Sequence, residues 1–363
     1  MKKTIKKLSL HDIHLELSAK MGEFAGWQVP LFYSSIISEY KQCRQNAALF
    51  DISHMGEFIF QGDIKTSGIE KAVTVSLGKI PVGRSRYGFI LNNSGGVIDD
   101  LVVFKISPNK LMFVVNAASE SCDYKKLKDT IFGGKLKNIS AQTAKIDLQG
   151  PLAKEVLKES LNFRQDIGYF SFVEFNYKEK SLLISRTGYT GELGYEIFMP
   201  AGLAPVVWQQ LLKNKKVKPA GFGARDILRL EMGYSLLGNE LKADITPLQA
   251  GLGNFIKFDK DFIGRRALIE EKNKGAKKTR VAFAANSKRI PRPGYKIYSA
   301  DKKIGEVTSG TYSSLLSAGI GLGYIDSSYQ QKEGIIFIGN QGKIKFEAKI
   351  VQLPFYKKGS LRS

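Results

Sequence analysis

The sequence predicts an α+β fold that ends in a separate all-β domain. Patterns typical of helices and strands do not follow one another in the regular β-α order of a doubly wound parallel sheet. From Val281 onward the chain contains short strand patterns and glycine turns without a convincing helix. The charged residues 270–278, with Gly275 among them, are expected to form the linker before this domain.

The first fifty residues are expected to be mainly helical, with a loop over residues 26–30. Residues 35–48 carry apolar side chains three and four positions apart, which is the spacing of an amphipathic helix. Further helices are expected over 122–130, 152–161, 206–213 and 224–237. Strands are expected over 57–60, 86–91, 97–106, 111–116, 143–148 and 181–186. The Asn- and Gly-rich turn at 92–96 joins two of these strands and predicts a β-hairpin.

Composition places the chain among globular proteins. Of its 363 residues, 43% are hydrophobic and 25% are charged, so it has enough apolar side chains to bury real cores. The apolar stretches have strand length, so we expect neither a membrane helix nor a signal peptide. The only two cysteines, Cys43 and Cys122, are far apart. A disulfide framework and a structural zinc site are therefore not expected, and a reduced cytoplasm fits best.

The formal net charge of +21 bears on partners rather than on the fold. Solvated surface lysines explain it as well as an anionic ligand or an acidic protein partner does. Nucleic acid is a third option. The lysines are scattered, however, and the two clusters at 2–7 and 272–280 are not interleaved with aromatic residues.

The three histidines, His11, His14 and His54, limit the catalysis that is available. The sequence has no HExxH, GxSxG or Walker A motif. His11 and His14 lack the pattern of partner carboxylates or cysteines that a metal site needs, so we expect them on the surface and predict no metal site.

Three segments have residue types suited to chemistry. Asp99 and Asp100 follow two glycines at the start of a strand, where adjacent side chains point to opposite faces. We therefore expect one of them in a drier pocket, able to steady a cation, and the other in solvent or at a cap. Two surface acids at a turn exit are the alternative.

The second segment, residues 185–196, contains three glycines together with Tyr189, Tyr195 and Glu196. It suits a flat, polar ligand that bears a ring, although a tight turn with a packed aromatic gives the same pattern. The third segment, residues 221–231, places Arg225 and Arg229 on one helix face. Anion binding and structural ion pairing are equally compatible with this spacing.

An ordered series of motifs resembles the glycine cleavage T-protein family from about Leu10 to the C-terminus. The series consists of residues 24–30, 50–56, 95–101, 186–196, 223–231, 308–310 and 354–356. This resemblance implies three domains in a cloverleaf around a folate channel. The first two domains are discontinuous α+β units with antiparallel sheets, and the third is an all-β barrel or jelly-roll-like domain. The implied boundaries are 1–50 with 141–231, 51–140 with 232–278, and 279–363.

The resemblance also implies a reaction. A T-protein takes the aminomethyl group from the lipoyl arm of the H-protein, releases ammonia and forms methylenetetrahydrofolate, with tetrahydrofolate as co-substrate and no metal. The P- and L-proteins belong to the same system. Asp100 matches the family's key aspartate. The family's folate contacts correspond to Met55, Tyr87, Asn116, Tyr189, Glu196, Arg225, Tyr234 and Arg362.

Within this set, Glu196 is expected to read the pterin edge, and Arg225 to meet the glutamate tail or an acid in the site. His54 is expected to be packed rather than catalytic. Two positions depart from the family pattern. Gln249 stands where relatives often carry Glu, and Leu237 where many carry Tyr.

Three other functions compete with this prediction. A folate-dependent demethylase on the same fold tends to lose the Ser53–His54–Met55 and Asp99–Asp100 signatures, which are retained here. A non-catalytic or RNA-maintenance folate-binding protein of the superfamily carries a Lys–Gly–Cys–Tyr-type motif, which is absent. A nucleic-acid binder would show salt-sensitive binding without any need for folate.

Overall fold

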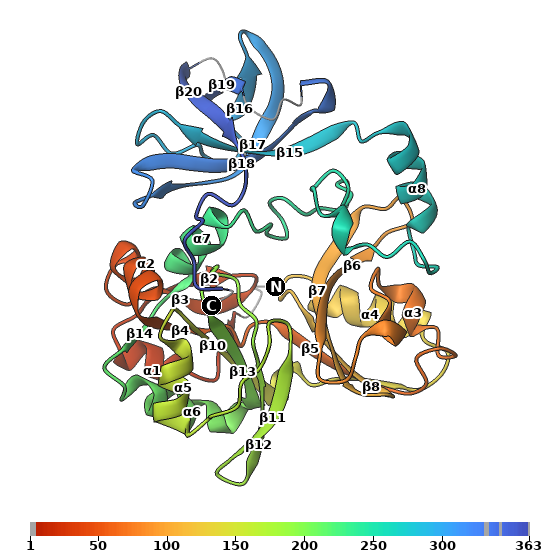
Figure 1. Cartoon of the computed structure of the whole chain (residues 1–363), viewed down its shortest axis with the longest axis vertical. Coiled ribbons are helices and arrows are strands. Elements are labelled where there is room, and N and C mark those ends of the chain that lie inside the picture. The colour runs from red at the N-terminus through yellow and green to blue at the C-terminus, as the bar shows by residue number, and fades with distance from the viewer. Residues whose placement is uncertain (1–4, 330–333, 341–342, 362–363) are drawn as a thin grey trace.

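The computed structural model describes residues 5–329, 334–340 and 343–361. These residues form three lobes (Figure 1). Two lobes each contain a mainly antiparallel sheet with helices, and the third is a closed barrel. The predicted α+β cloverleaf with an all-β C-terminal barrel is confirmed. The domain boundaries themselves stay a prediction.

The first lobe is built on a six-stranded sheet in the order β11-β12-β13-β10-β4-β14. Its strands are β4 (Ala47–Asp51), β10 (Thr143–Gln149), β11 (Phe172–Tyr177), β12 (Lys180–Ser185), β13 (Gly194–Pro200) and β14 (Val217–Pro219). The helices α5 (Ala153–Leu161) and α6 (Ala204–Leu212) pack on the face that carries Leu49 and Ile146. The helices α2 (Ile36–Gln45) and α7 (Phe222–Glu231) pack on the face that carries Ala48 and Phe50. Alternate residues of one strand therefore enter two different cores.

The second lobe contains a five-stranded sheet in the order β6-β7-β8-β5-β9. Its strands are β5 (Gly56–Gln61), β6 (Ser85–Leu91), β7 (Val97–Ser107), β8 (Lys110–Val115) and β9 (Lys135–Asn138). The helices α3 (Ile69–Ala72) and α4 (Glu120–Thr130) cover one face, which includes Leu101. On the opposite face, Phe104 packs against Phe172 and Phe198 of the first lobe. The two sheets thus meet through an aromatic cluster.

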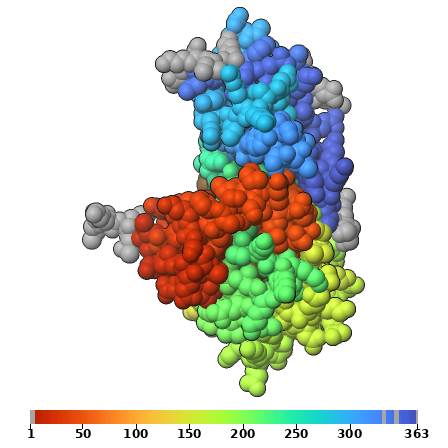
Figure 2. All heavy atoms as spheres, turned by 90° about the vertical axis from the view of Figure 1, so that its left-hand side faces the viewer, coloured from red at the N-terminus to blue at the C-terminus, as the bar shows by residue number. Residues whose placement is uncertain are grey.

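The third lobe is a six-stranded closed barrel in the order β15-β18-β17-β16-β19-β20. Its strands are β15 (Lys278–Ala285), β16 (Lys296–Ser299), β17 (Lys302–Ser313), β18 (Ala318–Asp326), β19 (Gly334–Asn340) and β20 (Lys343–Val351). Figure 2 shows the barrel in blue above the red N-terminal elements. The helix α8 (Arg265–Lys274) precedes the barrel and packs through Leu268 on the second lobe.

The structure corrects the predicted helical start. Only α1 (His11–Glu16) and α2 are helical there, and residues 20–32 form a hairpin of β2 (Lys20–Phe24) and β3 (Trp27–Phe32), with β1 (Lys6–Lys7) beside it. The physical reason lies in Ala25 and Gly26, whose positive φ angles of 50° and 79° form a tight two-residue turn that joins the strands.

Two further predictions of local structure were wrong for a related reason. The helix predicted to reach residue 237 ends at Glu231, because Gly233 has a φ of 69° and turns the chain away. The predicted linker at 270–278 is mostly the end of α8. Gly275, with a φ of 83°, terminates this helix rather than marking a flexible segment. In both cases the glycine follows a helix end.

Candidate active site

The predicted key carboxylate, Asp100, lies half-buried on β7. The antiparallel register pairs Phe89 with Asp100, so Tyr87 and Asp100 face the same side of the sheet. The Tyr87 hydroxyl donates to Asp100 Oδ2 at 2.9 Å, and Asn116 Nδ2 donates to Asp100 Oδ1 at 2.8 Å. Burial and then the charge of Asp99 raise the pKa of Asp100 to about 7, against the opposing effect of these two hydrogen bonds. Asp100 therefore changes its charge near neutral pH.

Asp99 does not face solvent, so the expectation that one of the two acids would be exposed was wrong. Its side chain is fully buried on the opposite face of β7, under α4. It accepts hydrogen bonds from the backbone N–H of Asn116 at 2.9 Å and from Asn116 Nδ2 at 2.7 Å. Adjacent strand residues do point to opposite faces, but both faces of this sheet are covered.

The central strand β10 supplies a row of buried polar side chains that faces α7. Lys145 forms an ion pair of 3.0 Å with Glu196, and Asp147 forms one of 2.5 Å with Arg225. Burial opposes the ionisation of Glu196, but the Lys145 ammonium and the Thr187 hydroxyl outweigh it and lower the pKa of Glu196. Glu196 is therefore held as a carboxylate. Of the two partners expected for Arg225, the structure shows an acid in the site.

Two stacked aromatic rings lie beside Arg225. The rings of Tyr189 and Tyr234 are stacked at 5.5 Å, and the Arg225 guanidinium lies 5.1 Å from the Tyr189 ring. The Tyr189 hydroxyl donates to the backbone carbonyl of Ser235. Burial raises the pKa of Tyr189, against the opposing charge of Arg229.

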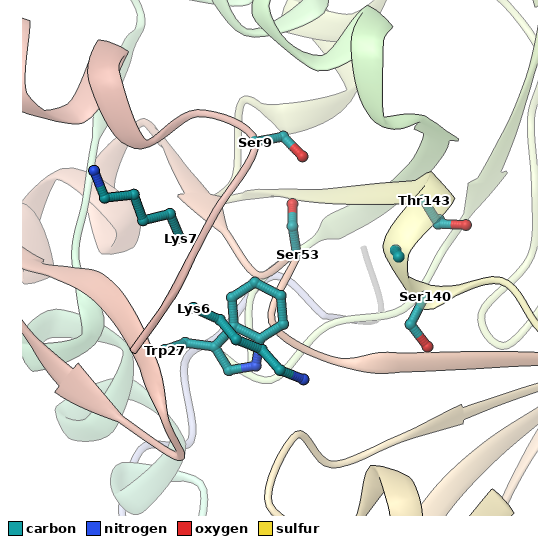
Figure 3. A pocket seen from close by; sticks show the side chains of 8 residues that line it. Lys6, Lys7, Ser9, Trp27, Ser53, Ser140 and Thr143 are labelled. Carbon is teal, nitrogen blue, oxygen red and sulfur yellow. The ribbon is translucent and has the colours of Figure 1, made fainter. Parts of the chain in front are cut away.

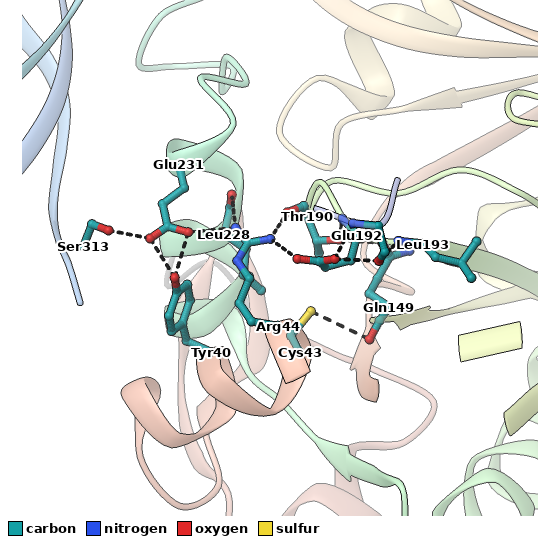
Figure 4. Close-up of polar contacts among 11 residues, drawn as sticks. Tyr40, Cys43, Arg44, Gln149, Thr190, Glu192, Leu193, Leu228, Glu231 and Ser313 are labelled. Atoms are coloured by element: carbon teal, nitrogen blue, oxygen red, sulfur yellow. Dashed lines mark hydrogen bonds and ion pairs between the residues drawn. The ribbon is translucent and has the colours of Figure 1, made fainter. Parts of the chain in front are cut away.

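Arg44 of α2 fixes the loop that carries Tyr189. Its guanidinium donates to Thr190 O at 2.6 Å and bridges Glu192 at 2.9 Å and Glu231 at 2.8 Å (Figure 4). Glu231 also accepts a hydrogen bond of 2.6 Å from Ser313 of the barrel. The loop is thus connected by charge-assisted hydrogen bonds to α2, α7 and the third lobe.

Most of the predicted site residues are linked through these contacts. The contacts form three groups, which are Asp100 with Tyr87 and Asn116, Tyr189 with Tyr234 and Arg225, and Glu196 with Met55, the last two joined through Lys145, whose Nζ lies 3.5 Å from the Met55 sulfur. Arg362 lies outside the described residues. Whether these side chains bind a ligand stays a prediction.

Sequence reasoning missed Lys145 and Asp147. A signal for them exists, because Lys145, Asp147 and Gln149 alternate with the apolar Ala144, Ile146 and Leu148. This alternation is typical of a half-buried strand, whose polar face ordinarily meets solvent. Here that face is buried too, with Lys145 and Asp147 at most 2% exposed.

The histidines are all buried. His14, expected on the surface, donates or accepts hydrogen bonds of 2.9 Å with Asp51 and with Tyr33, and His11 is only 6% exposed. His54 is packed, as expected, between the rings of Phe24 and Phe222. Burial and the charge of Arg225 lower the pKa of His54 to about 3, so its ring is neutral at physiological pH.

Gln249, which departs from the family pattern, contacts Glu271 in the structure. Gln249 Nε2 donates to Glu271 Oε1 at 2.8 Å, and Thr246 donates to Glu271 Oε2 at 2.6 Å. A glutamate at position 249 would place a second carboxylate against Glu271. Leu237, the other departure, packs at the edge of the core formed with Phe89 and Leu241.

A cavity of about 350 Å³ lies on the N-terminal side of the first lobe, between β1, Trp27 and residues 140–143 (Figure 3). Several of its polar groups are engaged in contacts within the protein. The Lys6 ammonium lies 5.1 Å from the Trp27 ring, and the hydroxyls of Ser53 and Ser140 are bonded to Asp51 and Asn138. None of the predicted site residues lines this cavity.

Within the described ranges, no three His, Cys, Asp or Glu side chains gather as a metal site. Among the helices that the structure describes, none is long and apolar enough to cross a membrane. Cys43 is buried and Cys122 is exposed, and both are free thiols.

Comparisons with known proteins agree with the sequence motifs. The family model described as "GCVT N-terminal domain" matches residues 10–260, and the "Glycine cleavage T-protein C-terminal barrel domain" matches residues 278–357. The aminomethyltransferase of Caldanaerobacter subterraneus is 43% identical, over 98% of this chain and 96% of that protein. The aminomethyltransferase of Thermotoga maritima is 40% identical over 99% of both chains. The crystal structure of the glycine cleavage system aminomethyltransferase T from Bartonella henselae superposes with a TM-score of 0.91 at 31% identity, over 98% of this chain and 99% of that one.

Proposed function

We propose that this chain, which belongs to the glycine cleavage T-protein family, transfers the aminomethyl carbon of lipoylated H-protein to tetrahydrofolate. Ammonia leaves, and the lipoyl sulfur is released as a thiol. The predicted enzyme class is confirmed, because relatives about 40% identical over nearly the whole chain are named aminomethyltransferases.

The observation that carries the proposed mechanism is the half-buried Asp100, held by two donors beside aromatic rings. An ionised carboxylate at this place stabilises a positively charged one-carbon unit and orients the amine that attacks it. Tyr87 and Asn116 each donate to one oxygen of Asp100, so the carboxylate keeps one orientation. Because its pKa is about 7, the active ionised form is populated at neutral pH.

The residues around Asp100 have the chemistry that tetrahydrofolate requires. The stacked, half-buried rings of Tyr189 and Tyr234 suit a flat ring system, and the ionised Glu196 suits a polar pterin edge with N–H donors. Met55, Tyr87, Asn116 and Arg225 would complete the contacts, with Arg362 at the glutamate tail. As co-substrate, tetrahydrofolate supplies the amine nitrogens that take up the carbon.

The test is turnover with aminomethylated H-protein and tetrahydrofolate for the wild type and Asp100→Asn. We expect the variant to lose at least about 100-fold in kcat, because the amide cannot carry the stabilising charge. Its affinity for tetrahydrofolate, measured by calorimetry, should stay within about threefold. Near-normal turnover would remove Asp100 from the mechanism. Dimethylglycine and a sulfonium donor, supplied as competing substrates, separate this reaction from a demethylase.

The partner we propose is an acidic H-protein, which the net charge of +21 would steer into contact. The rate of association should fall several-fold between low and physiological salt. An association rate that does not depend on ionic strength would remove this idea. We place the reaction in the cytoplasm, with the P- and L-proteins of the same system, because both cysteines are free thiols.

A further inference from the structure

The side chain of Gln149 lies inside the glycine-rich loop that carries Tyr189. Gln149 ends β10, is fully buried and pairs with Gly194 of β13. A Cβ atom added at Gly188 or at Gly194 would lie 2.1 Å from the Gln149 amide, which is well inside van der Waals contact. Because neither glycine has a positive φ angle, the close approach of this amide is what requires glycine at both positions. The loop thus closes tightly around one polar side chain.

The hydrogen bonds of the Gln149 amide fix its orientation. Nε2 donates to Asp147 Oδ1 and to the backbone carbonyl of Thr187, the latter at 3.1 Å. Oε1 accepts a hydrogen bond of 2.8 Å from the Thr190 hydroxyl. In the flipped orientation the amide oxygen would face a carboxylate and a carbonyl, which are both acceptors. Each of the two amide hydrogens therefore binds a different part of the site.

On one side, the amide holds the acid that pairs with Arg225. Asp147 Oδ2 forms the 2.5 Å ion pair with Arg225, and Gln149 binds the other oxygen. The Arg225 guanidinium in turn lies 5.1 Å from the Tyr189 ring. Burial raises the pKa of Asp147, and the charge of Arg225 and the hydrogen bond from Gln149 oppose this rise. Because both oxygens of Asp147 have donors, the carboxylate keeps one orientation and holds Arg225 in one place.

On the other side, the amide fixes the chain before and after Tyr189. The carbonyl of Thr187 accepts from Gln149, while the Thr187 hydroxyl donates to Glu196 Oε2 at 2.6 Å. The Thr190 hydroxyl donates to the same amide. Tyr189 therefore lies in a short segment that Gln149 holds at both ends.

We propose that Gln149 is a positioning residue of the folate site, whose single amide sets the place of the Tyr189 ring and of Arg225 and thereby the affinity for tetrahydrofolate. The inference rests on the proposed function. Both amide hydrogens of Gln149 are bonded within the protein, so the residue acts through its neighbours rather than through a contact with the ligand. Because these neighbours bind and Asp100 reacts, loss of the amide should raise KM for tetrahydrofolate more than it lowers kcat.

The test compares Gln149→Met with Gln42→Met, two substitutions that keep the side-chain volume and remove an amide with two hydrogen-bonded N–H groups. In the control, Gln42 Nε2 donates to the backbone carbonyls of Ala47 and Lys216, at 2.8 and 2.9 Å, in the same lobe. Gln149→Met should raise both KM and the calorimetric Kd for tetrahydrofolate about tenfold, since it removes a hydrogen bond to a charged group, with kcat within about threefold. Gln42→Met should leave Kd within about twofold.

A purely structural role would lower the melting temperature of Gln149→Met but leave its Kd for tetrahydrofolate at the wild-type value, and that result would overturn the proposal. If Gln149→Met does not fold, Thr190→Val takes its place, because it removes the hydroxyl that donates to Gln149 Oε1 and keeps the size of the side chain. Its Kd should rise about threefold, as expected for the loss of a neutral hydrogen bond. An unchanged Kd for Thr190→Val would overturn the proposal as well.

The placement of the loop is also measured without ligand, by amide hydrogen exchange of residues 187–194. Exchange there should be faster in Gln149→Met than in the wild type and unchanged in Gln42→Met, because only the first substitution frees the loop. Equal exchange in the wild type and Gln149→Met contradicts the positioning role. A wild type that transfers no aminomethyl group, but whose loop exchanges faster once Gln149 is replaced, contradicts only the proposed function.

Discussion

The hydroxyl group of Tyr87 donates a hydrogen bond of 2.9 Å to the carboxylate of Asp100 across the β6–β7 pair. The Tyr87 ring is held in place by edge contacts with Phe89 and Phe255, at 5.2 and 5.0 Å between ring centroids. A donor fixed in this way stabilises the ionised form of Asp100 and limits how far burial raises its pKa.

Tyr87→Phe should therefore raise the pKa of Asp100 by about one to two units, since a hydrogen bond to a charged group contributes about 1.5–3 kcal/mol. Turnover at pH 7 should fall about tenfold or more and recover toward pH 9. A pH–rate profile checks this. The control is Tyr324→Phe, which removes a hydroxyl of the barrel that donates to the backbone carbonyl of Glu240. It should leave the pH–rate profile unchanged. A Tyr87→Phe profile equal to that of the wild type would contradict the role of the hydroxyl.

Ionisation of Asp100 should lower the free energy of unfolding above neutral pH. Its folded-state pKa is raised from 3.8 to about 7, so its favourable contribution is complete below about pH 4 and is lost as the pH rises through 7. Asp100→Asn removes this loss. The melting temperature of the variant should exceed that of the wild type by a few degrees at pH 8 and by little at pH 4. Each kcal/mol in the free energy of unfolding corresponds to about 2–4 °C.

The matched control for this experiment is Asp259→Asn. Asp259 is exposed, and its hydrogen bond with Lys79 lowers rather than raises its pKa. Its substitution should give no gain in melting temperature at pH 8. If the gain of Asp100→Asn over the wild type did not depend on pH, burial of an ionised Asp100 would not be its cause.

Breaking the Lys145–Glu196 ion pair should strongly lower the free energy of unfolding. Both side chains are nearly buried, so Lys145→Met leaves Glu196 as an uncompensated buried charge, at a cost of about 3–5 kcal/mol in the free energy of unfolding. Adding Glu196→Gln should recover part of this loss. Lys216→Met, which breaks exposed pairs with Glu155 and Glu159, should cost about 1 kcal/mol or less. Denaturant unfolding measures all three. Equal costs for Lys145→Met and Lys216→Met would contradict the difference in burial.

Gln249→Glu should destabilise the contact between residues 246–249 and α8. It replaces the donor to Glu271 Oε1 with a second carboxylate, at a cost of about 1–3 kcal/mol. The double variant Gln249→Glu with Glu271→Gln restores one donor and one acceptor, so its melting temperature should return close to that of the wild type. Additive losses in the double variant would show that residue 249 acts through other contacts.

Local sequence signals predicted much of the fold. The hairpin around residues 92–96, the helices at 152–161 and 206–213 and the all-β character after Val281 follow from periodicity and turn residues. Where prediction failed, a glycine or a short turn decided the outcome. Ala25 and Gly26 reversed the chain at the edge of the loop expected over 26–30, so that strands flank them where helix was expected, and Gly233 and Gly275 ended helices. Such φ values depend on what the chain packs against next.

For the site, the sequence by itself determined the family, the order of the motifs and Asp100 as the carboxylate on which the proposed chemistry depends. Only the tertiary structure decided that Asp99 is buried, that Lys145 and Asp147 face the site and that His14 lies in the interior. The physical reason is that a strand pattern states which side chains share a face, but not what covers that face. Here a second sheet and helices from distant parts of the chain cover both sides, so polar residues that would otherwise be solvated become buried ion pairs.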